Sequence, residues 1–409
     1  MVNKKHSKKE QSDDDSSDDD SKKISSIKSL DQGSSDDKSL DDKSSDDASS
    51  DDESSDDDSL DDDDSSDDDS KKISSKKSSN DTNSDDDNKS NKTAKLNVLD
   101  LFCGCGGMSQ GLHKAGLNIV AGIDIWNKAI DSYKDNFDHL AICADLTKLS
   151  PEKFKSKYKI GKIDIIVGGP PCQGLSIAGK RDTKDPRNSL FMEFYKYLIY
   201  FKPKIFLMEN VIGILSMKTT QGEKVIDIIM KKLTKNYNCT INKLYASDFN
   251  VPQRRRRTII VGVRKDLKII PPEITPNPKN KMIPVKTILL KYKDVDEKYF
   301  LSEKALSGIK AKKEKMKNKG HGFGAQFLKM DSPSYTIPAR YWKDGYDALV
   351  RYNDDEIRRL TILELKRIQT FPDDYVLNGS NKEIIMQIGN AVACEFAYNL
   401  GKYLINLIK

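Results

Sequence analysis

The most constraining feature of this sequence is an abrupt change in residue type near position 95. Residues 1–95 contain 27 Ser and 29 Asp but no Cys, Phe, Tyr or Trp, and they carry a formal charge of −15. A segment with so few apolar side chains cannot bury enough surface to offset its conformational entropy. We therefore expect a disordered acidic tail over 1–95, and we place every folded domain in the 314 residues that follow.

The tail is built from short repeated motifs. The eleven residues Ser-Ser-Asp-Asp-Asp-Ser-Lys-Lys-Ile-Ser-Ser occur at 16–26 and again at 65–75. Such low complexity is typical of a solvated spacer. Serines followed by acids also suit acid-directed kinases, and phosphorylation would deepen the negative charge. A third hypothesis is that the tail binds basic partners, including the rest of this chain, and competes there with nucleic acid.

The remaining residues carry 53 Lys and Arg against 33 Asp and Glu, a net charge of +20. This charge indicates a polyanionic partner, although charge alone supports only non-specific attraction. No apolar run approaches about 18 residues, so we expect no membrane span. The charged start is not a secretory signal, and we expect an intracellular protein, nuclear or cytoplasmic. The six Cys lack paired C-x-x-C spacing, so no metal site is expected.

From Leu96 onward, short apolar runs alternate with amphipathic ones. Strands are expected over 98–102, 118–123, 140–144, 163–167, 205–208 and 258–263, and helices over 109–115, 127–136, 190–200 and 223–233. This alternation predicts an α/β fold with a doubly wound, mostly parallel, Rossmann-like sheet. Ligands of such sheets bind beyond the carboxyl ends of the strands, where we expect the functional residues.

The alternation ends after about Lys265. Residues 271–355 are rich in Pro, Lys and Gly, with a basic run near 310–319 and clustered aromatic residues after it. This change predicts a smaller inserted domain over 265–357, following a catalytic domain over 96–264. A helical pattern resumes over 354–369. The closing segment 358–409 contains an apolar stretch, 384–408, that we expect to pack back on the sheet.

A glycine-rich turn follows the first expected strand, in Asp100-Leu-Phe-Cys-Gly-Cys-Gly-Gly107. Its three glycines let the backbone approach a ligand near the start of a helix. Asp124 ends the second strand, where its carboxylate can accept a hydrogen bond from a ribose hydroxyl. Asp145 follows the third strand. Taken alone, these residues indicate a nucleotide-type pocket. A dinucleotide-dependent oxidoreductase would fit them nearly as well as another nucleotide-binding protein.

The fourth strand ends in Gly-Gly-Pro-Pro-Cys-Gln, where two prolines stiffen the backbone before Cys172. A thiol on a rigid loop at the ligand edge is a candidate nucleophile. The next strand ends in Glu209-Asn210-Val211, which brings a carboxyl group to the same edge. The run Gln253-Arg-Arg-Arg-Arg257 then indicates contacts with anions and bases. The oxidoreductase hypothesis assigns no role to Cys172 or to the arginine run.

Together these residues closely resemble the cytosine-C5 DNA methyltransferase family. The motifs Pro-Pro-Cys-Gln, Glu-Asn-Val and Gln-Arg-Arg-x-Arg occur in the family's order, and the resemblance continues through Arg359-Leu360-Thr361, Phe371-Pro372 and Gln387-Ile-Gly-Asn-Ala-Val392. It covers residues 96–409. It implies S-adenosylmethionine as the methyl-donating co-substrate, duplex DNA as the partner, a target-recognition domain over 265–357, and no metal. We expect a monomer.

The resemblance also implies roles for individual residues. In the donor pocket, the lining residues are Phe102, Gly104 and Gly106. Asp124 holds the ribose, Asp145 contacts the adenine amino group, and Asn390 helps to close the pocket. In catalysis, Cys172 is the nucleophile, Glu209 grips the cytosine edge, Arg257 contacts the base carbonyl oxygen, and Arg255 supports a closed loop. One departure is that Asp124 and Ile125 stand where many members have Glu and an aromatic residue, which loosens adenine stacking.

The implied chemistry explains why these residue types are needed. Thiolate addition at C6 activates cytosine C5 to attack the sulfonium methyl group, while Glu209 neutralises charge that develops toward N3. The base must leave the duplex stack, at a cost of about a few kcal/mol. Residues 173–189 are expected to close over it, with Arg187 as a phosphate contact.

Two alternatives stay open. A tRNA cytosine-C5 methyltransferase shares the DNA-type motifs, although the Cys-Phe-Thr signature usual in that branch is missing here. A non-catalytic nucleic-acid-binding relative would keep the fold without the reaction. The target DNA sequence cannot be read from the residues, because base specificity depends on how loops present side chains in the groove.

Overall fold

The computed structural model describes residues 95–171, 190–219, 221–276, 282–318 and 325–408. All of them belong to one compact unit of the chain, 48–409. The expected acidic tail except its last residue, Cys172, Arg187 and the expected loop 173–189 lie outside the described residues. Within these ranges, no helix is long and apolar enough to cross a membrane.

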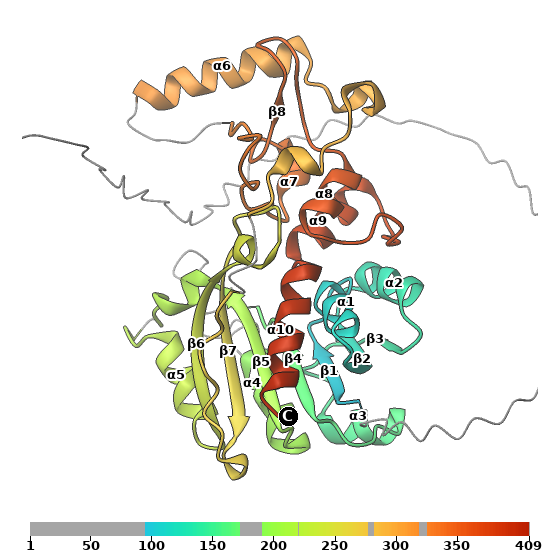
Figure 1. The fold of residues 1–409 in the computed structure, drawn as a ribbon, viewed down its shortest axis with the longest axis vertical. Coiled ribbons are helices and arrows are strands. Elements are labelled where there is room, and N and C mark those ends of the chain that lie inside the picture. Colours follow the sequence, from blue (N-terminus) through green and yellow to red (C-terminus); the bar gives the residue numbers. More distant parts are fainter. Residues whose placement is uncertain (1–94, 172–189, 220, 277–281, 319–324, 409) are drawn as a thin grey trace, which may run out of the picture. The chain divides into compact units, whose positions relative to one another are not determined.

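A seven-stranded sheet formed between residues 97 and 264 has the strand order β3-β2-β1-β4-β5-β7-β6 (Figure 1). Its strands are β1 (Asn97–Leu101), β2 (Asn118–Asp124), β3 (Leu140–Cys143), β4 (Ile165–Gly168), β5 (Ile205–Val211), β6 (Tyr237–Tyr245) and β7 (Arg256–Arg264). Strands β1 to β5 pair in parallel, whereas β7 runs antiparallel to both β5 and β6. The predicted α/β fold with a mostly parallel sheet is confirmed.

Both faces of the sheet are covered by helices, which explains why its strands read as nearly continuous apolar runs. The helices around it are α1 (Gly107–Lys114), α2 (Asn127–Asn136), α3 (Pro151–Tyr158), α4 (Leu190–Phe201), α5 (Val225–Leu233) and α10 (Cys394–Asn406). Alternate strand residues such as Ile166 and Val167 point to opposite faces. Ile166 joins the core formed with α3, α4 and α5, and Val167 joins the core formed with α1 and α10.

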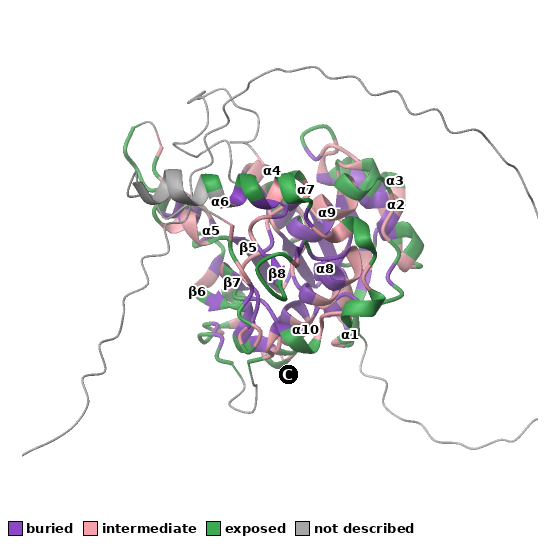
Figure 2. Ribbon diagram, turned by 90° about the horizontal axis from the view of Figure 1, so that it is seen from above, coloured by how far each residue is buried: buried purple, intermediate pink, exposed green. Residues whose placement is uncertain are grey.

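Residues 265–357, the recognition part expected from the sequence, have short elements and share a core with the two helices that follow them. The elements are α6 (Glu303–Asn318), α7 (Tyr341–Asp344), β8 (Val350–Arg351) and β9 (Ile357–Arg358), and the two helices are α8 (Ile362–Ile368) and α9 (Asn381–Asn390). Val285 and Ile337 share a core with Leu365 of α8 and Ile388 of α9. Buried residues gather toward the middle of the view in Figure 2. Of the expected apolar stretch 384–408, α10 packs on the sheet, whereas α9 packs against α7 and α8.

The prediction of a helix over 354–369 is wrong for the first half of that range. Residues 357–358 pair as a strand with 350–351, and the helix begins only at Ile362. The reason is a capping box, in which the Thr361 side chain accepts from the Glu364 amide and the Glu364 side chain accepts from the Thr361 amide. This reciprocal pair satisfies amides at the helix start and fixes where α8 begins.

Candidate active site

Glu209 and Arg257 meet at the carboxyl end of β5. Arg257 lies opposite Val211 in the β5–β7 register, so its side chain leaves the sheet on the same face as that of Glu209. Its Nε lies 2.8 Å from Glu209 Oε1 in an ion pair, and only 12% and 13% of the two side chains are exposed. The pair therefore fixes the direction of a carboxylate and a guanidinium at one point of the expected ligand edge.

The Gly-Pro-Pro turn after β4 lies against the same carboxylate. Asn210 Nδ2 donates to Pro170 O at 2.9 Å, which ties the turn to β5. A Cβ added to Gly169 would lie 3.1 Å from Glu209 Oε2, so only glycine leaves this approach unhindered. The turn that directly precedes Cys172 is thus placed beside Glu209, while Cys172 itself lies outside the described residues.

Arg255 is buried, with 5% of the residue exposed, and joins the arginine segment to two other parts of the chain. Its Nη2 donates to Gly389 O at 2.9 Å and its Nη1 to Ile337 O at 3.3 Å. Burial lowers the pKa of Arg255 well below its usual range, and the neighbouring charge of Arg257 adds to that effect. Its predicted support of a closed loop remains a prediction, because that loop lies outside the described residues.

A buried pair of glutamines completes this junction. Gln253 Nε2 donates to Gln369 Oε1 at 3.0 Å, and Gln253 Oε1 accepts from the Ile337 amide at 2.9 Å. Gln369 Nε2 in turn donates to Ile388 O at 2.9 Å. Both glutamine side chains lack exposed surface. Gln369 was not predicted as a functional residue, and its only signal in the sequence is a lone amide that follows the apolar end of α8.

The glycine-rich loop after β1 is held by Asp124. Asp124 Oδ2 accepts from the Gly104 amide and Oδ1 from the Trp126 amide, both at 2.9 Å. Burial raises the pKa of Asp124, and these amides oppose the shift. The loop contains left-handed backbone at Phe102, where φ is 60°, and at Gly106, where φ is 96°. Three of the residues predicted for the donor pocket, Phe102, Gly104 and Asp124, are therefore brought together.

The glycine-rich loop borders open space on one side. A Cβ added to Gly104 would meet no atom within 4 Å, so the loop borders open space there. Ile125 is 67% exposed directly after β2, which leaves its side chain free to contact a planar ring. Asp145 accepts from the Thr147 amide and hydroxyl at 2.9 and 2.7 Å, and the hydroxyl lowers the pKa of Asp145.

The last predicted motif returns to the glycine-rich loop. A Cβ added to Gly107 would lie 2.3 Å from Val392 O, so the two backbones touch. Cys105 Sγ also donates to Gln387 O at 3.7 Å. Asn390 ends α9 between these contacts and is exposed. A cavity of about 460 Å³ beside α3 and α4 is lined by none of these residues, and the described ranges contain no cluster of His, Cys, Asp and Glu suited to a metal ion.

A chain of four buried or half-buried polar groups lies under the glycine-rich loop. Ser109 Oγ donates to Asp100 Oδ2, Tyr133 Oη bonds to Ser109 Oγ, and His139 Nε2 bonds to Tyr133 Oη, each at 2.7 Å. Burial raises the pKa of Asp100 to about 7, and burial lowers that of His139 to about 4. This chain of polar groups was not predicted, because its only signal in the sequence is an acidic residue inside an otherwise apolar strand.

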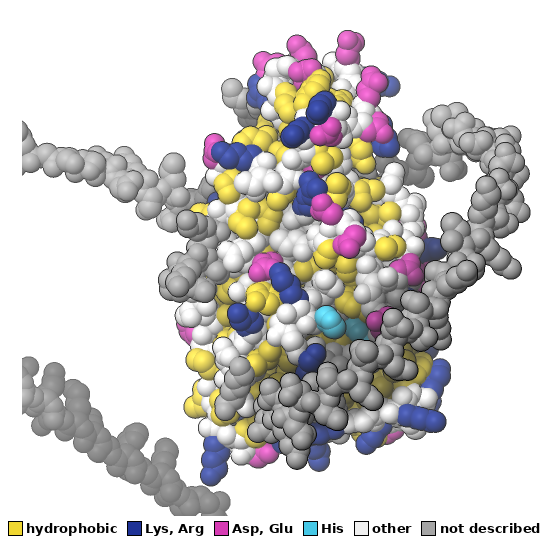
Figure 3. Space-filling model, turned by 45° about the vertical axis from the view of Figure 1, so that its right-hand side comes forward, with side chains coloured by type: hydrophobic (Ala, Val, Ile, Leu, Met, Phe, Trp, Pro, Cys, Tyr) yellow, Lys and Arg dark blue, Asp and Glu magenta, His cyan; other side chains and the backbone are white. Residues whose placement is uncertain are grey.

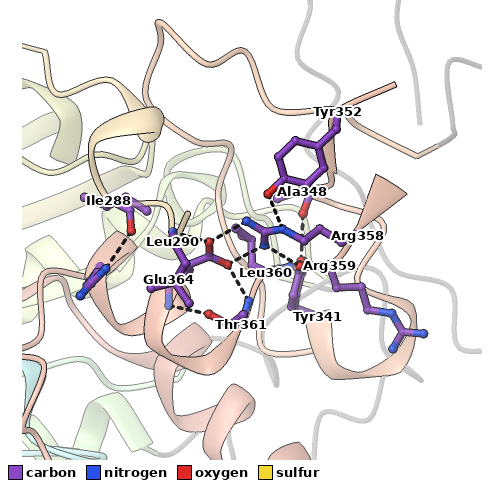
Figure 4. A network of polar contacts seen from close by, with 11 residues as sticks. Ile288, Leu290, Tyr341, Ala348, Tyr352, Arg358, Arg359, Leu360, Thr361 and Glu364 are labelled. Carbon is purple, nitrogen blue, oxygen red and sulfur yellow. Dashed lines mark hydrogen bonds and ion pairs between the residues drawn. The ribbon is translucent and has the colours of Figure 1, made fainter. Parts of the chain in front are cut away.

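A second buried polar network lies where the recognition part meets α8 (Figure 4). Arg358 Nη1 and Nη2 each donate to a Glu364 carboxylate oxygen at 2.8 Å. Glu364 Oε1 also accepts from the Leu290 amide at 2.9 Å, and Arg358 Nε donates to the Tyr352 hydroxyl at 3.0 Å. The network therefore connects segments that lie more than sixty residues apart in the sequence.

Comparisons with known proteins show what this chain is similar to. The model of the C-5 cytosine-specific DNA methylases matches residues 96–406. The Type II methyltransferase M1.ScrFI of Lactococcus lactis subsp. cremoris is 32% identical over 326 residues, which are 78% of this chain and 81% of that protein. The Type II methyltransferase M.DdeI of Desulfomicrobium norvegicum is 40% identical over 206 residues, which span about half of either chain, 49% and 47% respectively.

Solved structures share the fold. A mutant of Spodoptera frugiperda DNMT2 superposes with a TM-score of 0.60 at 25% identity, covering 76% of this chain and 100% of that one. The Entamoeba histolytica methyltransferase EhMeth gives a TM-score of 0.63 at 20% identity, covering 78% and 100%. The second likeness concerns the fold alone.

Proposed function

This chain belongs to the C-5 cytosine-specific DNA methylase family, and we propose that it transfers the methyl group of S-adenosylmethionine to C5 of cytosine in duplex DNA. The observation that carries this proposal is the convergence of the Gly-Pro-Pro turn, Glu209 and Arg257 at one sheet edge. The turn leads directly into Cys172. In this proposal, Cys172 is the nucleophile, Glu209 handles a proton and Arg257 supplies a positive charge, and all three act on one cytosine.

Cys172 is proposed to act as the nucleophile. Its thiolate forms a bond to C6 of cytosine, and the electrons of the C5–C6 double bond move toward N3 and O2. Glu209 in its protonated form gives its proton to N3, and Arg257 stabilises the charge at the carbonyl oxygen. In the free protein Arg257 bonds to Glu209 instead. Substrate binding would therefore redirect Arg257 from the carboxylate to the base.

The second half of the reaction forms the product. S-adenosylmethionine, when bound, would supply a methyl group on a sulfonium centre. As C5 of the activated ring forms the new carbon–carbon bond, the sulfur–methyl bond breaks and S-adenosylhomocysteine leaves. A base removes the C5 proton, the S–C6 bond breaks, and the Cys172 thiolate is released. The glycine-rich loop and Asp124 would hold the donor, because Gly104 borders open space and Asp124 fixes the loop. Neither reacting carbon is accessible in a stacked duplex, so base flipping is part of the proposal.

The test is methyl transfer from radiolabelled donor to unmethylated duplex DNA and, in parallel, to unmodified tRNA. We expect label in duplex DNA only, recovered as 5-methylcytosine after hydrolysis, and no incorporation by C172S. Duplexes containing 5-fluorocytosine at the target should trap the protein covalently in the presence of donor. Label in tRNA but not in DNA would support the tRNA enzyme instead. Binding of DNA without any transfer would support a non-catalytic relative.

Residues 265–357 are proposed to read the target sequence. This proposal is supported by the contacts that join the recognition part to the arginine segment, since the Arg254 amide donates to Ser334 O at 2.8 Å. The Thr336 hydroxyl donates to Arg254 O at 3.0 Å. Loops placed beside the cytosine site in this way can contact the flanking bases.

A further inference from the structure

We infer that Arg256, held against the ring of Tyr245, contacts a DNA backbone phosphate beside the cytosine site. The inference rests on the proposed function and adds a DNA contact to it. Arg256 lies between Arg255, which is buried, and Arg257, which is paired with Glu209. Successive strand residues point to opposite faces, so Arg256 leaves β7 on the face opposite Arg257.

The position of the Arg256 side chain is set by its cross-strand neighbour. Tyr245 is its direct partner in the β6–β7 register, and the guanidinium carbon lies 5.5 Å from the centre of the tyrosine ring. Tyr245 is 37% exposed and Arg256 is exposed, so the stacked pair faces solvent. A guanidinium that already rests on a ring loses less side-chain freedom when it binds an anion.

The charge of Arg256 is not neutralised within the described ranges. No carboxylate there forms an ion pair with Arg256 or with the exposed Arg254. By contrast, Arg257, Arg264 and Arg351 each have an acidic partner. A planar guanidinium with free donors is the group best suited to two-point contact with a phosphate.

The location connects the pair to the reaction site. Arg257 Nη1 donates to the backbone oxygen of Arg256 at 2.7 Å. On the other side, Arg254 bonds through its backbone to Ser334 and Thr336 of the recognition part. A duplex that placed one cytosine at Glu209 and flanking bases at the recognition part would run past Arg254 and Arg256. Its phosphates would then come within reach of Arg256.

Net charge alone would not single out this residue. Lys and Arg side chains are spread over the face shown in Figure 3 rather than gathered in one patch. Lys155 offers a matched comparison, because it also lies over a tyrosine ring, that of Tyr200, at 5.9 Å. It belongs to α3, which leads into the start of β4 and so lies at the opposite edge of the sheet (Figure 1).

The experiment measures the affinity of the full-length protein for a short fluorescent duplex of mixed sequence over a range of salt concentrations. Each phosphate contact contributes about 0.9 to the slope of log K against log salt. We expect R256Q to lower the magnitude of the slope by about that amount, and R256K and K155Q to leave it unchanged. An unchanged slope in R256Q, or an equal fall in K155Q, would overturn the inference.

Variants at Tyr245 test how the arginine is held. Y245F keeps the ring and should bind DNA as the wild type does, whereas Y245L should weaken binding at low salt. A loss in Y245F equal to that in Y245L would contradict positioning by the ring. Thermal melting of each variant shows whether the β6–β7 pair remains folded, since only the slope reports the lost phosphate contact.

Methyl transfer to unmethylated plasmid DNA separates this inference from the proposed function. We expect R256Q to raise the KM for DNA several-fold while keeping kcat at saturating DNA. A fall in kcat with unchanged KM would overturn the phosphate contact and leave the proposed function standing. If the wild-type protein methylates nothing, the proposed function fails, and the salt slopes still decide whether Arg256 contacts the duplex.

Discussion

Arg358 and Glu364 form a two-point ion pair in which neither side chain has exposed surface. The pair joins β9 to the first turn of α8, and Glu364 extends the connection to the Leu290 amide. Charges removed from water in this way are tolerated only because each has its partner and further hydrogen bonds. The ion pair therefore connects β9 to the helix that ends just before Gln369.

We expect replacement of one partner to be far more harmful than replacement of both. E364Q leaves the Arg358 charge buried without its counter-charge, which should lower the free energy of unfolding by about 3–5 kcal/mol. The double variant R358M/E364L removes both charges and should recover much of that loss. Urea unfolding of the wild type and the variants gives the comparison. Equal stability of E364Q and the double variant would show that the unpaired charge is not the cause.

Glu209 is the second target for substitution. E209Q keeps the shape of the side chain but cannot supply a proton, so we expect kcat to fall by about 100-fold or more. E193Q is the matched control, because Glu193 is also a mostly buried glutamate paired with a cation, Lys196, but lies on α4. Single-turnover methyl transfer with saturating DNA reports the chemical step. A kcat for E209Q within two-fold of that of E193Q would remove Glu209 from the proton transfer.

Asp100 provides a pH test of the buried polar chain. Its folded-state pKa of about 7 lies above the ordinary value of 3.8 because burial disfavours the charged form. A raised carboxyl pKa contributes stability that is fully present below the unfolded pKa and is lost as pH rises through the folded pKa. As the pH rises from 4 to 7, the wild type should therefore lose stability relative to D100N, which has no carboxyl group to titrate at this position. The loss should be at most about 1.4 kcal/mol per pH unit.

The contribution of His139 to stability changes with pH in the opposite direction. Burial lowers its pKa from 6.5 to about 4, so its contribution to stability is present above pH 6.5 and is lost as pH falls toward 4. In the wild type these two groups oppose each other over that range. H139F should thus lose less stability than the wild type as the pH falls from 6.5 to 4. Parallel urea titrations of wild type, D100N and H139F would reveal the two opposed trends, and parallel curves would contradict both assignments.

The difference between what the sequence predicted and what it concealed has a physical cause. Strand ends could be located because each strand is a short apolar run, and this placed Asp124 and Glu209 at the ligand edge. Arg255 was harder, since a run of four arginines looks solvated, yet this residue is buried against Gly389 and Ile337.

Pairs of buried polar residues were not visible from the sequence at all. Gln253 and Gln369 lie 116 positions apart, and each alone looks like an ordinary surface amide. Only the folded chain shows that they satisfy each other. The short elements of the recognition part were missed for a related reason, because two-residue strands such as β9 have no periodicity, and the helix start at Thr361 depends on a local cap.

Gly106 offers a final test of the loop proposed to hold the methyl donor. Its φ of 96° disfavours any side chain, and an added Cβ would lie 2.5 Å from a ring carbon of Phe137 and 2.7 Å from the Tyr375 hydroxyl. Gly116 is the matched control, because its φ of 100° is similar but an added Cβ meets no atom within 4 Å.

G116A should therefore cost only the backbone strain, about 1–2 kcal/mol, while G106A adds an overpacking cost of about 1–3 kcal/mol. Because the ring positions around Gly106 support the loop, we also expect G106A alone to weaken binding of S-adenosylmethionine, measured by calorimetry on folded protein. If G106A and G116A are equally stable and bind the donor equally well, the close packing around Gly106 does not shape the donor site.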